Sequence, residues 1–185
     1  MDENEGQVVA EGTSDDGASW SLSARRVRLD DMEHTESGLQ VVMRVTSADG
    51  LRQGEEGIGG ELPSLTGRMI DDIHWGGGTD EPRSFCGYVH PDIRRLTLTT
   101  TDGSSVDVPL YDCADFPEVH FAALAMPDDL RFVAVTGYSR DGEQLAQLKV
   151  PRQGITLRWS IGDRSGETWM PVEPGDVPGD VPRST

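Results

Sequence analysis

The sequence predicts an all-β fold, and three observations support this prediction. Apolar residues recur in short runs that alternate with polar residues, which is the period of a half-buried strand. Gly, Asp and Ser separate these runs, as turns separate the strands of a sandwich or barrel. In two segments the apolar residues on either side of a turn define a hairpin register. We therefore expect about ten strands in an antiparallel β-sandwich, or in two packed sheets built of hairpins.

The N-terminal part of the chain contains three candidate strands. They are QVVAEG at residues 7–12, SWSLSARRVRL at 19–29 and GLQVVMRV at 38–45. The turn-rich segment TSDDGA joins the first two, because Gly, Asp and Ser favour tight turns.

A short helix is expected near residues 64–74. In SLTGRMIDDIHW, the residues Leu65, Met69 and Ile73 are four positions apart, which is the spacing of one helical face. Ser64 precedes them and could cap the first turn.

The segment TLTTTDGSSVDVPL at 97–110 predicts a hairpin with a three-residue loop. For Leu98 to face Val106 across the pair, the loop must contain an odd number of residues. Residues 101–103 meet this requirement, and Gly103 can adopt the positive φ that such a loop needs.

The segment FVAVTGYSRDGEQLAQLKV at 132–150 predicts a second hairpin. Here a two-residue Asp-Gly turn at 141–142 pairs Val135 with Leu148, so that the apolar residues share one face. An isolated glycine within a strand often marks a bulge, and we expect one at Gly137.

Two further segments complete the predicted strands. EVHFAALAM at 118–126 has a helix-forming composition, but Pro117 and Pro127 bracket it so closely that a strand is favoured. ITLRWSI at 155–161 and ETWMPV at 167–172 flank the turn GDRSG and predict a last hairpin.

The predicted organisation is a single all-β domain over residues 7–171. It could consist of two sub-halves joined near 51–84, where glycines are frequent. Residues 1–6 are expected to form a disordered acidic leader. Residues 172–185 are expected to form a disordered tail rich in Pro and Gly, in which GDVP occurs twice.

The charge of the chain limits its partners. The chain of 185 residues has 33 acidic and 16 basic residues, a formal net charge of −17. A field of this sign repels phosphate backbones, so we expect no nucleic-acid partner. No apolar run is long enough to cross a membrane and the start is acidic, which predicts a cytoplasmic protein without membrane insertion. If the N-terminus is trimmed, an extracytoplasmic location is expected instead, and the oligomeric state stays open.

A set of turn and core positions between residues 7 and 150 carries a resemblance to a known kind of domain. These positions are Gly87, Val89, Pro91, Ile93, Arg95, Leu96, Leu98, Asp102, Gly103, Asp141 and Gly142, with VVAEGTSDDGASWSL near the start. The pattern resembles a β-rich domain of actinobacterial proteins that has no assigned function. The resemblance implies an envelope-associated or secreted protein and brings no catalytic residues. This chain departs from the pattern because it shows no apolar leader.

The two cysteines allow three interpretations. A disulfide between Cys86 and Cys113 would stabilise the fold by about 3.5 kcal/mol. A zinc site would use these cysteines with His90 and His120, but the spacing within each Cys and His pair differs from that of known zinc knuckles. Two buried, inert thiols are the third interpretation and are slightly favoured over the disulfide, while zinc is disfavoured.

The segment HWGGGTDEPRS suggests a binding loop. Trp75 could stack on a ligand while Asp80 and Glu81 accept hydrogen bonds, with His74 beside them. The alternative is a plain connector between the two sub-halves, which is favoured.

No catalytic motif is recognisable, and no cofactor is expected. The sequence therefore favours a non-catalytic β-domain that binds a protein or another polar partner through loops or an exposed sheet face. Two alternatives stay open, namely a metal-dependent or thiol enzyme centred on Cys86, His90, Cys113 and His120, and a subunit of a larger assembly.

Overall fold

In a computed structural model of the chain, the described residues are 6–28, 37–60, 62, 67–77 and 80–150. Residues 1–150 form one compact unit and 151–185 a second, so the fold below is that of the first unit. The described residues contain twelve strands and no helix, which confirms the all-β prediction. The strands are β1 (Gln7–Thr13), β2 (Ser19–Arg28), β3 (Ser37–Thr46), β4 (Gln53–Gly60), β5 (Ile70–Gly76), β6 (Arg83–Val89), β7 (Arg95–Thr100), β8 (Ser105–Val108), β9 (Leu110–Tyr111), β10 (His120–Met126), β11 (Phe132–Tyr138) and β12 (Gln144–Lys149).

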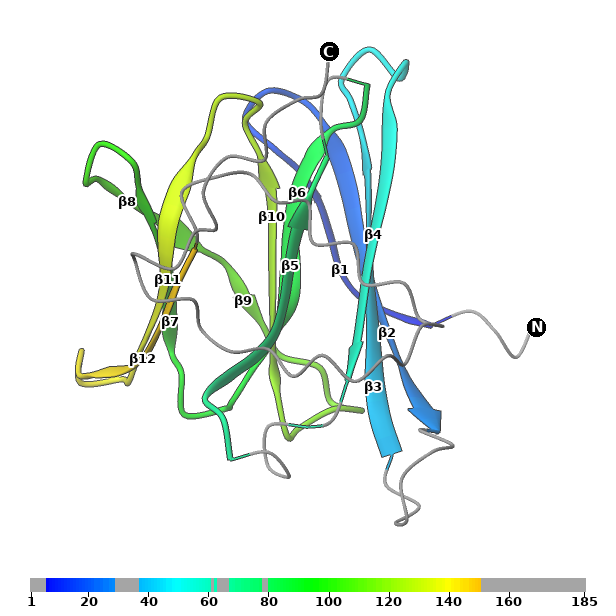
Figure 1. Ribbon diagram of the computed structural model, residues 1–185. Coiled ribbons are helices and arrows are strands. Elements are labelled where there is room, and N and C mark those ends of the chain that lie inside the picture. Colours follow the sequence, from blue (N-terminus) through cyan, green and yellow to red (C-terminus); the bar gives the residue numbers. More distant parts are fainter. Residues whose placement is uncertain (1–5, 29–36, 61, 63–66, 78–79, 151–185) are drawn as a thin grey trace, which may run out of the picture. The chain divides into compact units, whose positions relative to one another are not determined.

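The strands form three antiparallel sheets. Sheet A has the order β1-β2-β3-β4, sheet B the order β5-β6-β10-β9, and sheet C the order β12-β11-β7-β8. Figure 1 shows sheet B, in green, between the blue and cyan strands of sheet A and the strands of sheet C. The sequence predicted two packed sheets at most, and the structure adds a third layer.

Each face of sheet B contributes to a separate hydrophobic core. Cys86, Tyr88 and Phe121 on one face pack against Leu22 and Met43 of sheet A, among others. On the opposite face, Phe85, Val89 and Ala122 pack against residues of sheet C. Sheet B is therefore the middle layer of the unit.

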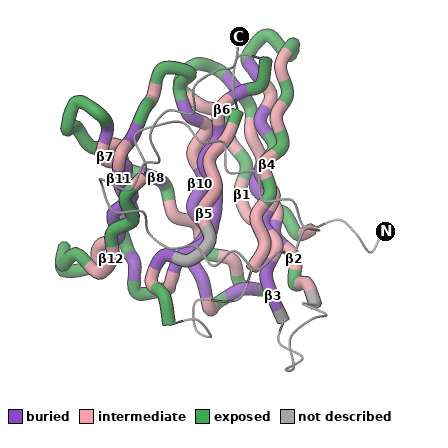
Figure 2. The backbone as a smooth tube through the Cα atoms, viewed as in Figure 1, coloured by how far each residue is buried: buried purple, intermediate pink, exposed green. Residues whose placement is uncertain are grey.

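Burial along the strands follows from this layering (Figure 2). Successive side chains of a strand point to opposite faces, so an outer sheet shows alternating burial and a middle sheet does not. In β3 the residues Leu39, Val41 and Met43 are buried, whereas those between them are not. In β6, by contrast, every residue from 84 to 89 is buried.

The sequence predicted a short helix near residues 64–74, and this prediction is wrong, because residues 70–76 form strand β5. Residues 70–76 pair with β6, while residues 63–66 lie outside the described part of the chain. The register of β5 shifts between Ile70 and Ile73, as at a β-bulge. Both side chains consequently join the core between sheets B and C. A bulge thus reproduces the apolar spacing that suggested a helix.

The predicted hairpin at 97–110 is confirmed. Leu98 pairs with Val106, and the N–H of Thr100 donates to the carbonyl of Ser104 at 2.9 Å. Gly103 closes the loop with φ of 88°. The loop therefore contains three residues, as its parity required.

The second hairpin has the predicted register but a different turn. Val135 pairs with Leu148, as expected. The Ser139 N–H donates to the Glu143 carbonyl at 2.8 Å, so the loop contains residues 140–142 and not two residues. The register shift next to Gly137 compensates for the extra loop residue.

Several sequence predictions fall outside the described residues. These are most of the acidic leader at 1–6, the strands at 155–161 and 167–172, and the tail at 172–185. Within the described part of the chain, no helix has the length and apolar character needed to span a membrane.

Candidate functional site

Cys86 and Cys113 are both free thiols in the structure, so the disulfide is not formed. Cys86 on β6 is fully buried in the core between sheets A and B. Cys113 follows β9 and packs, partly buried, against the same core. The third interpretation of the cysteines, two packing thiols, agrees with this arrangement.

Cys86 is poorly suited to nucleophilic chemistry. Burial raises the pKa of its thiol to about 12, and the nearby negative charge of Glu56 acts in the same direction. The thiolate is the reactive form, so this side chain stays protonated and inert at neutral pH.

The proposed zinc ligands do not form a site. His90 Nδ1 lies 3.5 Å from Asp92 Oδ2, while His120 Nε2 lies 2.9 Å from Asp112 Oδ1. Among the described residues, no group of three or more His, Cys, Asp or Glu side chains is arranged to hold a metal ion. The described part of the chain therefore does not bring the two cysteines and these histidines together as a metal-binding cluster.

His74 and Trp75 belong to strand β5 and not to a loop. His74 Nε2 lies 2.6 Å from Glu56 Oε2, so this pair joins β5 to β4 across two sheets. The ring of Trp75 meets that of Phe132 edge to face, with centroids 5.4 Å apart. Both side chains are used in packing, which leaves the predicted binding loop without its stacking residue.

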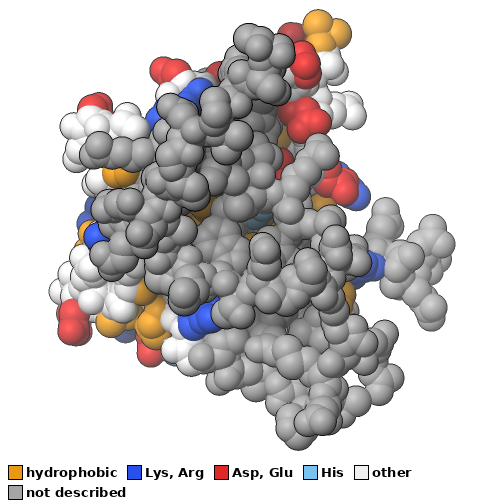
Figure 3. Space-filling model, viewed as in Figure 1, with side chains coloured by type: hydrophobic (Ala, Val, Ile, Leu, Met, Phe, Trp, Pro, Cys, Tyr) orange, Lys and Arg blue, Asp and Glu red, His pale blue; other side chains and the backbone are white. Residues whose placement is uncertain are grey.

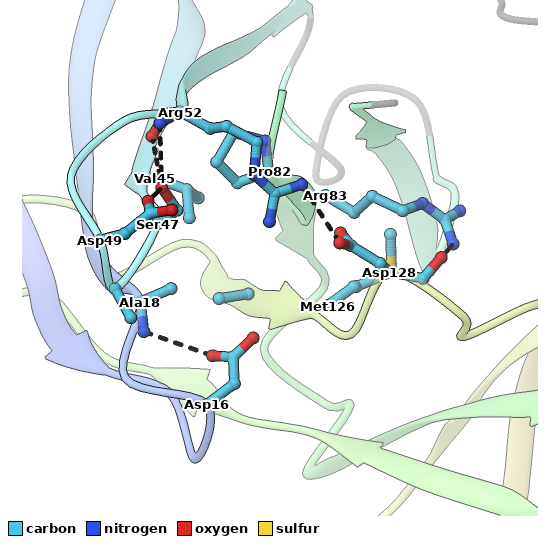
Figure 4. Close-up of a pocket in the computed structure, with 12 residues that line it drawn as sticks. Asp16, Ala18, Val45, Ser47, Asp49, Arg52, Pro82, Arg83, Met126 and Asp128 are labelled. Carbon is cyan, nitrogen blue, oxygen red and sulfur yellow. Dashed lines mark hydrogen bonds and ion pairs between the residues drawn. The ribbon is translucent and has the colours of Figure 1, made fainter. Parts of the chain in front are cut away.

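Asp80 and Glu81 are exposed, and the next residue, Pro82, lines a small pocket that is the candidate functional site (Figure 4). It has a volume of about 200 Å³. Its walls come from the β1–β2 turn, the β3–β4 turn, the segment before β6 and the loop after β10. Four separate connections of sheets A and B therefore build it.

The floor of the pocket is apolar. Ala18, Val45, Ala125 and Met126 line it, and Pro82 forms part of a wall. Ala18, Val45 and Ala125 belong to the core between sheets A and B or pack against it, whereas Met126 belongs to the core between sheets B and C.

Asp16 and Asp49 stand at the rim in equivalent local structures. The Ser14 hydroxyl and then the Ala18 N–H donate to Asp16, and these bonds lower the pKa of its carboxyl. The Ser47 hydroxyl, at 2.5 Å, and the Leu51 N–H lower the pKa of Asp49 in the same way. Both carboxylates are therefore charged at neutral pH, and their turns hold them in place.

Arg52 crosses the mouth of the pocket. Figure 4 shows its side chain extending from the β3–β4 turn toward Asp128, and the Nη1 to Oδ2 distance is 3.1 Å. Arg83, on the side of Asp128, donates to the carbonyl oxygen of Leu130 and so fixes the loop after β10. The rim thus carries three carboxylates and two arginines, of which Arg52 pairs with Asp128.

A second hollow, of about 490 Å³, lies on the outer face of sheet A. Ser21, Ser23 and Val42 form its centre. Arg25 Nε donates to Gln40 Oε1 at 2.6 Å within it. Its lining includes one carboxylate, that of Glu55, whereas the lining of the pocket includes three.

Sequence analysis missed the pocket, although a local signal was present. The pattern Ser/Thr-x-Asp-Gly occurs at residues 14–17, 47–50, 100–103 and 139–142. Each copy lies in a hairpin turn whose glycine has positive φ. The pattern predicts where carboxylates are held, but not that two of these turns meet at one pocket.

Among the residues that line the pocket, the Ser47 hydroxyl is hydrogen-bonded to Asp49, and the charged groups are the carboxylates and arginines of the rim. Comparison of the chain with protein families, with curated proteins and with solved structures finds no match.

Proposed function

We propose that this chain is a non-catalytic binding domain whose pocket takes a basic side chain of a protein partner. The observation that carries the proposal is an apolar floor surrounded by the carboxylates of Asp16, Asp49 and Asp128, which come from three different loops. A lysine or arginine side chain has the matching form, an apolar stem with a cationic end.

The size of the pocket supports one side chain as the ligand. Sites for small-molecule ligands usually enclose about 300 to 1,000 Å³. At about 200 Å³ the pocket is below this range, but it is large enough for a single side chain. A partner would insert one residue here and contact the surrounding loops with its neighbours.

The charge of this end of the unit also favours a cationic ligand. Acidic side chains gather where β3 and β4 are joined (Figure 3). The Arg52 to Asp128 pair is exposed at 36% and 61%, and pairs of this kind contribute little to stability. A cation from a partner can therefore compete for Asp128.

The net charge of −17 would speed the encounter with a basic segment and oppose binding of nucleic acid.

The proposal is tested by NMR titration of the ¹⁵N-labelled chain with a short peptide that contains one lysine, at low salt. We expect amide shifts in residues 14–18, 47–52 and 125–131, and we expect added salt to weaken them. The triple variant D16N/D49N/D128N keeps the side-chain shapes and should lose the shifts.

The matched control is Asp107→Asn. Asp107 is exposed at 67% and pairs with Arg95 on sheet C, and it does not line the pocket. Binding by this variant should equal that of the unchanged chain. Shifts confined to the outer face of sheet A, or equal binding by the triple variant, would refute the proposed site.

A further inference from the structure

A second ionisable cluster surrounds His120, the first residue of β10. The side chain of His120 is only 9% exposed. Its Nδ1 lies 2.8 Å from the main-chain oxygen of Ile93. Its Nε2 lies 2.9 Å from Oδ1 of Asp112 and 3.3 Å from Nη1 of Arg94. Nε2 therefore has two neighbours, of which one can only accept and the other can only donate a hydrogen bond.

The position of one proton decides which neighbour binds. A carbonyl oxygen only accepts, so Nδ1 carries a hydrogen in both the neutral and the protonated ring. In the protonated ring, the Nε2–H donates to Asp112. In the neutral ring, the lone pair on Nε2 accepts from Arg94 and repels the Asp112 carboxylate. The two contacts cannot both be favourable in one protonation state.

Among the described residues, Arg94 and Asp112 are the charged side chains that contact the ring. The backbone neighbours of His120 are apolar, because His120 pairs with Val89 on β6 and Val89 pairs with Ile70 on β5. In the loop before β7, His90 and Asp92 contact each other. Arg94 and Asp112 are therefore the two side chains that compete for Nε2 of His120, and the protonation state of the ring decides between them.

We propose that His120 is a pH-dependent latch for the segment that follows β9. At acidic pH the imidazolium holds Asp112. As the pH rises, Nε2 releases its proton to solvent, Arg94 donates to Nε2, and Asp112 turns outward. The Asp112 side chain is already 84% exposed, so this movement needs no repacking of the core. Histidine is the side chain that commonly changes charge between pH 5 and 8, and this sets the pH range of the test.

The latch acts on a segment that covers one of the cores. Asp112 directly follows β9, and residues 113–119 lead from it to β10. Phe116 and Val119 of this segment are buried in the core between sheets A and B. Release of Asp112 loosens the chain at residue 112, while Cys113, Phe116 and Val119 stay packed against the core.

The test follows the His120 ring and the backbone together in the ¹⁵N-labelled full chain between pH 5 and 8. Long-range ¹H–¹⁵N spectra should show that Nδ1 keeps its proton and Nε2 loses it. The amide signals of Asp112 and Cys113 should move with the same midpoint as Nε2. In Asp112→Asn these coupled amide shifts should be lost, whereas the control Asp92→Asn should retain them.

A second variant keeps the test decisive if Asp112→Asn folds poorly. Arg94 is exposed, and Arg94→Met removes the donor to the neutral ring, so the coupled transition should move to higher pH. The latch is refuted if Nδ1 is the nitrogen that loses its proton, or if the amides of residues 112 and 113 do not follow the ring. An unchanged transition in both variants would also refute it.

Discussion

At the scale of single residues, Gly76 shows how closely two sheets approach each other. A Cβ at Gly76 would collide with the carboxylate of Glu56, which reaches from β4 of sheet A. The same carboxylate pairs with His74, two residues earlier on β5. The absence of a side chain at position 76 therefore leaves room for the contact between Glu56 and His74 across the two sheets.

The substitution Gly76→Ala should displace the Glu56 carboxylate from His74 and destabilise the protein by about 1 kcal/mol, because the end of this flexible side chain can move aside but loses its contact with His74. Urea unfolding measures this loss of stability. The control is Gly57→Ala on the same strand as Glu56, where the nearest side-chain atom to a Cβ would be Val42 Cγ2 at 3.6 Å. Equal stability of the two variants would contradict the proposed close approach.

At the scale of elements, one local turn recurs in four hairpins. In the three copies that contain Asp16, Asp49 and Asp102, a Ser or Thr hydroxyl and a main-chain N–H donate to the aspartate. A glycine with positive φ then returns the chain to the next strand. In the fourth copy the Ser139 hydroxyl instead accepts from the N–H groups of Asp141 and Glu143.

The turn at Asp102 should make stability depend on pH in acid. The Thr100 hydroxyl, followed by the Ser104 N–H, lowers the pKa of Asp102 from 3.8 to about 2. The folded state then favours the ionised carboxyl, so its contribution is complete above pH 3.8 and is lost as the pH falls toward 2.

The measurement compares the melting temperatures of the unchanged chain and Asp102→Ala between pH 2 and 6. The variant should melt earlier at pH 6, and the difference should disappear near pH 2. A difference that stays constant over this range would show that the hydrogen bonds to Asp102 do not depend on its charge.

At the scale of the whole unit, the middle position of sheet B determines which substitutions are tolerated. Ala122 and Ala123 are neighbours on β10, and their exposed fractions are 0% and 1%. Ala122 faces the core with sheet C, and Ala123 faces the core with sheet A. A sandwich of two sheets would bury only one of them.

Ala122→Asp and Ala123→Asp should each destabilise the unit by more than about 3 kcal/mol, because each buries an unpaired charge. On the outer strand β3, Val41→Asp should be equally damaging, while Val42→Asp should be tolerated because Val42 faces outward. Circular dichroism during urea unfolding separates these outcomes. Tolerance of either substitution on β10 would contradict the three-layer arrangement.

The sequence by itself determined the features that depend on neighbours along the chain. The sequence identified β1, β2, β3, β7, β8, β10, β11 and β12, but it missed β4, β5, β6 and β9. Parity correctly paired Leu98 with Val106 and Val135 with Leu148. These predictions succeed because a hairpin joins residues that are close in sequence, and the two-residue period of a strand leaves one register that buries the apolar side chains.

Only the tertiary structure decided the features that depend on distant segments. The middle layer, the bulge that made residues 70–76 look helical, and the pocket all require contacts between separate hairpins. The carboxylates of Asp16 and Asp128 are 112 positions apart in the sequence, and no local pattern relates them. The packing of sheet A on sheet B places them at one rim, and the candidate function exists only because of that packing.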